Sequence, residues 1–116
     1  SLLGHALEMA EASGVGFLLH WKRLPWVCAA RELAAAGGSF PGGTDRNRAY
    51  FGGRVRFAAV LGEIEQQTLF TPETSGGLLA ALPSGELPAV RERFEREGQG
   101  LWVIGETVAG QGIEVS

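Results

Sequence analysis

The run VGFLLHW at residues 15–21 constrains the fold most, because it is almost wholly apolar and too short for a helix. Such a run is typical of a strand buried on both faces of a sheet. A helical pattern precedes it, which Ser1 can cap and Gly14 can end. Residues 24–38 predict a second helix, with Pro25 in its first turn and a Gly-Gly stop. The chain therefore begins in the order helix, strand, helix.

The rest of the chain adds further strands and helices. Residues 39–53 are rich in glycine and predict a long loop with one short helical turn around 45–50. A short strand near Val55 and a helix are expected over 55–70, and a buried strand over 77–82. Residues 84–98 predict a helix with Leu87, Val90 and Phe94 as its apolar stripe. Its charged residues form three pairs at four-residue spacing: Arg91/Glu95, Glu92/Arg96 and Arg93/Glu97.

Two strands end the chain and complete the predicted fold. Residues 101–108 and 112–115 predict these strands, joined by a hairpin turn at AGQG. Strands therefore alternate loosely with helices along the chain. This alternation predicts an α+β fold, with a mixed sheet of about four or more strands and helices packed against it.

Composition narrows the class of protein. A chain of 116 residues, of which 45% are hydrophobic and 20% charged, can bury one core, so we expect a single domain over residues 1–116. The net charge of −3 disfavours nucleic acid and anionic lipid as partners. No apolar stretch approaches the roughly 20 residues that span a bilayer, and the lone Cys28 cannot form an internal disulfide. A cytoplasmic location is expected. Because the chain opens at Ser1 in a helical pattern, we expect a piece of a longer protein.

The first candidate site is the turn Thr74, Ser75, Gly76 and Gly77 in the stretch TPETSGGLLAALP. Successive backbone N–H groups in a glycine-rich turn can hold an anion such as a phosphate. No Lys follows the glycines, so the stretch is not a P-loop. The alternative is a tight turn that leads into the buried strand expected at 77–82.

The second candidate site is the stretch PGGTDRN at residues 41–47, with Gly42, Gly43, Thr44 and Asn47 as its binding residues. A flexible backbone beside hydroxyl, amide and guanidinium groups can hold an anion or ribose hydroxyls. The alternative is a solvated loop in which Asp45 and Asn47 cap a helical turn.

Other reactive residue types form no evident catalytic set. His5 and His20 stand fifteen residues apart and do not have the spacing of metal ligands, so no metal site is expected. Cys28 lies in an alanine-rich segment and is interpreted as a packing residue and not as a nucleophile.

Four ordered motifs give the chain a specific resemblance. LLGHALEMAEASGVG, PGGTDRNRAY, TPETSGGLLAALP and VIGE resemble motifs in the carboxy-terminal domain of selenophosphate synthetase, also called selenide, water dikinase. That family belongs to the superfamily related to aminoimidazole ribonucleotide synthetase, and the resemblance implies an α/β sandwich like the carboxy-terminal domain of that enzyme. Thr71 and Glu73 depart from the pattern, which has Asp and Gln at these places.

The resemblance implies a two-domain enzyme that uses ATP and magnesium to convert selenide and water into selenophosphate, AMP and phosphate. Its nucleophile, a Cys or selenocysteine, and most of its metal-binding aspartates belong to an amino-terminal domain that this chain lacks. We therefore expect the chain to be inactive alone and to bind no cofactor tightly. The resemblance also implies that the full-length enzyme is a homodimer. Cys28 does not correspond to the family nucleophile.

Two other readings of the chain stay open. It resembles the equivalent domains of other ATP-dependent relatives, such as a hydrogenase maturation factor or thiamine monophosphate kinase. It could also be a stand-alone module that binds a small anion. If the resemblance holds, residues 1–5, 41–47 and 74–77 are expected to converge on one face, toward the active cleft.

Overall fold

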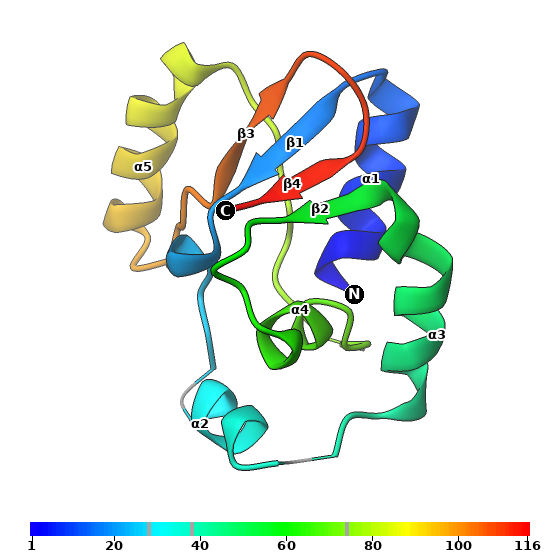
Figure 1. The fold of residues 1–116 in the computed structure, drawn as a ribbon. Helices are drawn as coiled ribbons and strands as arrows, with labels where there is room; N and C mark the ends of the chain where they lie inside the picture. Colours follow the sequence, from blue (N-terminus) through cyan, green and yellow to red (C-terminus); the bar gives the residue numbers. More distant parts are fainter. Residues whose placement is uncertain (28, 38, 74) are drawn as a thin grey trace.

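A computed structural model describes residues 1–27, 29–37, 39–73 and 75–116 (Figure 1). The elements in chain order are α1 (Leu2–Ser13), β1 (Gly16–Leu19), η1 (Trp21–Arg23), α2 (Ala30–Ala35), α3 (Gly42–Phe51), η2 (Gly52–Arg54), β2 (Val55–Phe57), α4 (Glu63–Thr68), η3 (Ser84–Glu86), α5 (Leu87–Arg96), β3 (Gly105–Val108) and β4 (Ile113–Val115). The predicted α+β fold is confirmed, because these elements form a mixed four-stranded sheet with packed helices.

The sheet has the strand order β2-β4-β1-β3. β1 runs parallel to β4 and antiparallel to β3, so β1 lies between the last two strands of the chain. The predicted hairpin between those two strands is therefore wrong. Residues 109–112 instead pass the amino-terminal end of β1, where the Phe17 amide donates to the Gly112 carbonyl at 3.0 Å.

The two faces of the sheet differ in chemistry. Phe17 and Leu19 of β1 share the inner face with Ile113 and Val115 of β4, and all four side chains are buried. Leu18 points to the outer face and is only half-buried, in the same row as Glu106 and Glu114. The expectation that residues 15–20 form a strand is confirmed, but the strand is buried fully on one face only.

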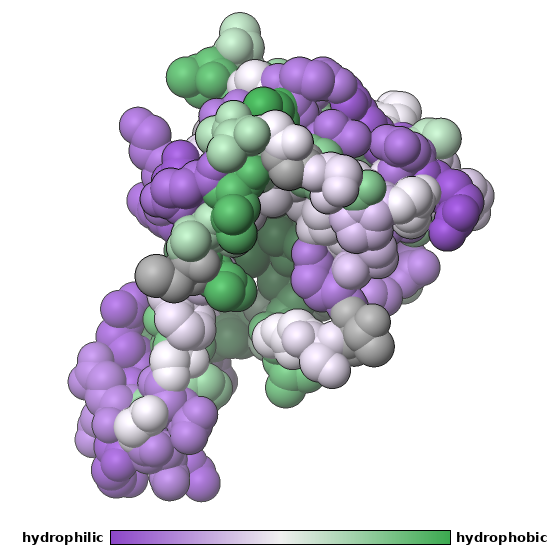
Figure 2. Space-filling model, turned by 90° about the horizontal axis from the view of Figure 1, so that it is seen from below, coloured by the Kyte–Doolittle hydropathy of each residue, from purple (hydrophilic) through white to green (hydrophobic). Residues whose placement is uncertain are grey.

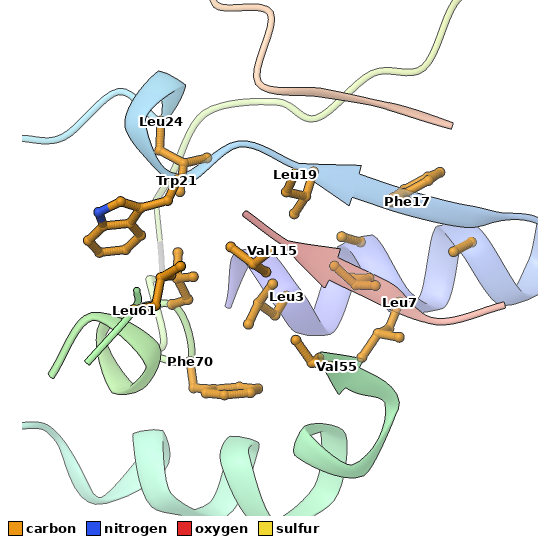
Figure 3. Close-up of a cluster of buried hydrophobic side chains, with 14 residues drawn as sticks. Leu3, Leu7, Phe17, Leu19, Trp21, Leu24, Val55, Leu61, Phe70 and Val115 are labelled. Atoms are coloured by element: carbon orange, nitrogen blue, oxygen red, sulfur yellow. The ribbon is translucent and has the colours of Figure 1, made fainter. Parts of the chain in front are cut away.

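Helix α1 covers the inner face of the sheet (Figure 1). The Ser1 Oγ atom accepts from the Gly4 amide at 3.0 Å, as predicted for a helix cap. Gly14 ends the helix at φ 66°, a left-handed conformation that glycine adopts without a steric cost. Leu3 and Leu7 of this helix are fully buried and point toward Val55 and Val115 (Figure 3).

Phe70 closes the core from below, between the sheet and α3 (Figure 3). It is fully buried and stacks edge-on against Phe57, with the two ring centroids 6.1 Å apart. Burying a phenylalanine side chain contributes about 2 kcal/mol or more to folding. Phe70 therefore fixes the segment that joins α4 to residues 71–77.

Residues 42–51 form a ten-residue helix, so the prediction of a long loop with one short turn is wrong. Glycine lowers helix propensity, and that rule favoured a loop. Gly42 and Gly43 occupy the first turn, and side chains further along α3 bond to residues 63–70. Tertiary contacts thus stabilise a helix that local propensity alone does not predict.

The strand predicted at residues 77–82 does not form. Among the described residues, no backbone group of 75–82 makes a hydrogen bond, and the Leu78 side chain is 103% exposed. Leu79 packs against the core, which keeps the segment close to the sheet. The strand predicted at 101–108 begins only at Gly105. Just before it, the backbone amide of His20 donates to the Ile104 carbonyl.

Two predicted helices also differ in extent. The helix expected over 24–38 is limited to α2, because Ala29 adopts a left-handed conformation at φ 64° and interrupts it. The expected packing of Cys28 lies outside the described residues. In α5, the predicted apolar stripe is only half-buried, and Glu92/Arg96 is the one predicted pair that forms an ion pair within the described part of the chain.

Several large apolar side chains are exposed to solvent. Seen from below, apolar surface gathers around a hollow in the middle of the molecule (Figure 2). The exposed residues include Val27, Leu33, Val60, Leu78 and Trp102. Large contiguous apolar surface on a soluble domain commonly marks a contact with another domain or protein.

Candidate functional site

The start of α3 leaves backbone donors free. Pro41 stands at the cap position and offers no capping side chain. The Thr44 amide donates to the Pro41 carbonyl at 2.8 Å, whereas no hydrogen bond among the described residues reaches the amides of Gly42 and Gly43. Free amides and the helix dipole at such a terminus favour an anion. The predicted anion-binding role of the two glycines therefore agrees with their free N–H groups and stays a prediction.

Thr44 lies one residue further along the same turn. Its side chain has no exposed surface, and its Oγ1 atom is buried without a partner among the described residues. A buried hydroxyl without a hydrogen bond costs about 1–3 kcal/mol. Thr44 is therefore a polar group in the core, and its side chain does not reach the surface in this structure.

Asn47, also predicted to bind a ligand, is engaged within the fold. Its Nδ2 atom donates to the Phe70 carbonyl at 2.9 Å. Two residues earlier in α3, Asp45 Oδ1 accepts from Gln67 Nε2 at 3.1 Å. The first bond joins α3 to Phe70, just after α4, and the second joins α3 to α4 itself. Asn47 thus acts as a positioning residue for the chain that leads into the second glycine turn.

An ion pair adds to the same contact between helices. Arg48 of α3 donates to both carboxylate oxygens of Glu63 at the start of α4. The hydrogen bond from Arg48 holds the pKa of the Glu63 carboxyl below its ordinary value, and the same bond raises the pKa of Arg48. The sequence carried only a weak signal for this pair, because fifteen residues separate the two charges.

The two predicted glycine stretches approach each other through Gly43 and Pro72. A Cβ atom added to Gly43 would stand 3.0 Å from Pro72 Cγ, so the backbone of α3 packs directly on that ring. Thr74, predicted to bind, lies outside the described residues. Ser75, Gly76 and Gly77 are exposed, and a Cβ atom on Gly77 would meet only open space.

The beginning of the chain meets α3 at the other end of that helix. A Cβ atom on Gly4 would stand 2.9 Å from Phe51 Cε2, in the last turn of α3. Since a helix rises about 1.5 Å per residue, Phe51 lies roughly 14 Å along α3 from Gly42. Three segments were expected to converge on one face. Residues 41–47 contact Pro72, just before residues 74–77, whereas Gly4 in the first segment packs at the opposite end of α3.

The two histidines lie in separate places. His5 Nδ1 is 3.3 Å from Glu8 Oε2 on the exposed side of α1, and His20 Nδ1 is 3.1 Å from Ser116 Oγ. Within the described ranges, no group of three or more His, Cys, Asp or Glu residues could hold a metal ion. No described helix has the length and the apolar character needed to cross a membrane.

Comparison with known proteins decides the family. All 116 residues match the family model described as AIR synthase related protein, C-terminal domain. The chain belongs to this family.

Curated proteins give a finer match. The chain is 40% identical over 110 residues to the selenide, water dikinase of Burkholderia ambifaria. This match covers 94% of the chain and 31% of that protein. It is 38% identical over 115 residues to the selenide, water dikinase of Myxococcus xanthus and 34% identical to that of Caldanaerobacter subterraneus subsp. tengcongensis, and each match covers 98% of the chain. The resemblance found in the sequence is confirmed. The chain spans about a third of the length of these relatives.

Proposed function

We propose that the chain is the carboxy-terminal domain of a selenide, water dikinase, which makes selenophosphate, AMP and phosphate from selenide, ATP and water. The observation that carries this proposal is the sequence identity of 34–40% over nearly the whole chain to curated proteins of that name. Hydrogenase maturation factors and thiamine monophosphate kinases stay as alternatives within the same superfamily. A stand-alone anion-binding module is less well supported, because the matched relatives are about three times as long.

The exposed apolar surface supports a role as one part of a larger enzyme. Val60 is 82% exposed and Leu78 is 103% exposed, although both are large apolar side chains. An interface between domains of one chain commonly covers about 600–1,500 Å². We infer that an amino-terminal domain covers part of this surface and carries the nucleophile and the metal ligands. The whole enzyme would be a cytoplasmic homodimer.

The described residues offer hydrogen-bond donors for the phosphates of ATP but no set of ligands for magnesium. The amides of Gly42, Gly43 and residues 75–77 are N–H donors of the kind that bind phosphate oxygens. Magnesium needs oxygen ligands in near-octahedral array, and the described residues offer no cluster of acids for it. In the proposed enzyme, these amides would hold and orient phosphate oxygens. The isolated chain should therefore bind magnesium-ATP only weakly, and a micromolar dissociation constant from titration calorimetry would contradict this.

A chimera tests the proposed function. The carboxy-terminal third of the Burkholderia ambifaria relative is replaced by this chain, with the intact relative and its truncated form as controls. The chimera should consume ATP only when selenide is present, whereas the truncated form and this chain alone should not. A soluble, folded chimera without selenide-dependent ATP consumption would count against the proposal.

A further inference from the structure

A second surface lies away from the glycine stretches, between η1, α5 and the segment before β3. Figure 1 shows η1 and α5 on one side of the sheet and α3 on the other. The surface is a hollow of about 550 Å³, open to solvent. Val60 and Leu78, which support the proposed contact with an amino-terminal domain, do not line it.

Three cations line this hollow: Lys22, Arg23 and Arg91. All three are exposed, and the lining includes no acidic residue. None of the three takes part in an ion pair within the described part of the chain, whereas Arg96, on the same helix as Arg91, pairs with Glu92 at 3.0 Å. Like charges in one hollow repel each other, so a negatively charged partner is favoured there.

Trp102 gives the same hollow a large apolar contact. Its side chain is 59% exposed, beside Leu101 and Val103. The ring folds back over Gly100, where an added Cβ atom would stand 2.3 Å from Trp102 Cη2. A glycine at position 100 therefore allows the ring to lie against the backbone with much of its surface free.

We propose that this hollow, formed by Lys22, Arg23, Arg91 and Trp102, docks an acidic segment of a protein that carries one large apolar side chain. Its carboxylates would pair with the three cations, and its apolar side chain would pack on Trp102. Pockets for small molecules are enclosed and bury most of the ligand, whereas this hollow is open. Tryptophan and arginine are the residue types that most often dominate protein interfaces.

The test uses a fluorescently labelled peptide of Glu and Asp residues around one central Phe, titrated with the whole chain and followed by anisotropy. Arg91→Gln and Trp102→Ala should each weaken binding about fivefold or more, as expected when one contact of a small interface is lost. Arg56→Gln is the matched control, since it removes an exposed cation on the opposite edge strand, β2, where Arg56 pairs with Glu114. This control should leave binding unchanged.

Peptide variants and small anions test whether the hollow recognises both the charge and the apolar side chain of the peptide. Replacing the acids of the peptide by Gln and Asn, or its Phe by Ser, should each weaken binding, and so should added salt. Equal binding of the neutral peptide, or equal losses in Arg56→Gln and Arg91→Gln, would overturn the proposal. Tighter binding of inorganic phosphate or AMP than of the peptide would also overturn it. Circular dichroism checks that each variant stays folded.

Discussion

Asn47 Nδ2 donates to the Phe70 carbonyl oxygen at 2.9 Å, across 23 residues of chain. This bond fixes α3 to the residues just before the exposed glycine turn. Because Phe70 is fully buried, the bond also ties α3 to the core. Two stretches that look like independent loops in the sequence thus form one structural unit.

Removing this bond should destabilise the domain. Asn47→Ala leaves the Phe70 carbonyl without its partner, at a cost of about 1–2 kcal/mol in the free energy of unfolding. Urea unfolding followed by tryptophan fluorescence measures it. Gln111→Ala is the control, because Gln111 is exposed and its side chain makes no hydrogen bond within the described residues, so its effect should be below about 0.5 kcal/mol. Equal stabilities of the two variants would argue against a positioning role for Asn47.

Two adjacent glycines at the start of α3 should respond differently to alanine. An added Cβ atom meets Pro72 Cγ at 3.0 Å from Gly43, and meets nothing within 4 Å from Gly42. Alanine is the better helix former by up to about 1 kcal/mol, so Gly42→Ala should be neutral or stabilising. Gly43→Ala should be the less stable variant, because its methyl group must displace Pro72. Thermal unfolding of the pair gives the comparison, and the reverse order would show that the contact is absent.

Gly105 should be essential to the pairing of β3 with β1. A Cβ atom there would stand 2.1 Å from the Leu18 carbonyl oxygen, which is far inside contact distance. Gly105→Ala should therefore cost about 1–3 kcal/mol or more, as overpacking does. Gly85→Ala is the control, because no atom lies within 4 Å of the added carbon. Hydrogen exchange should show faster exchange of β3 amides in Gly105→Ala alone, and protected β3 amides in that variant would refute the clash.

The ion pair between Arg48 and Glu63 should make stability depend on pH. The folded-state pKa of Glu63 is lowered by the hydrogen bond from Arg48, so the pair stabilises the fold above the ordinary value of 4.5. This contribution is lost as the pH falls through the lowered pKa. The stability difference between the parent chain and Glu63→Gln should thus shrink between about pH 6 and about pH 3. Glu65→Gln, also in α4, is the control, and a constant difference for Glu63→Gln would contradict the pair.

Local patterns in the sequence predicted the elements that local interactions determine. The cap at Ser1, the stop at Gly14 and the strand after it are all present, since each depends on residues close in sequence. The short strand at Val55 and the helix after it are also confirmed.

Elements that depend on distant partners were predicted less well. The hairpin rule paired the last two strands, but β1 lies between them. Residues 77–82 have the composition of a strand, yet none of the strands in the described ranges pairs with them. Helix α3 needs its bonds to Glu63 and Phe70, which no local pattern reveals.

The structure shows where the described candidate site residues lie, and their ligand-binding role stays a prediction. The free amides at Gly42 and Gly43 agree with an anion-binding role, which stays a prediction. Thr44 and Asn47 were chosen for their polar atoms, but the structure buries the first and engages the second with Phe70. Sequence reveals the type of a side chain and not the direction in which it points.

The nucleotide product of the chimera tests the central claim most directly. Chromatography separates AMP from ADP after the reaction of the chimera with ATP, magnesium and selenide. The account predicts AMP that forms only with selenide, together with selenophosphate and phosphate. ADP in place of AMP, or the same ATP consumption with and without selenide, would contradict the assignment of this chain to a selenide, water dikinase.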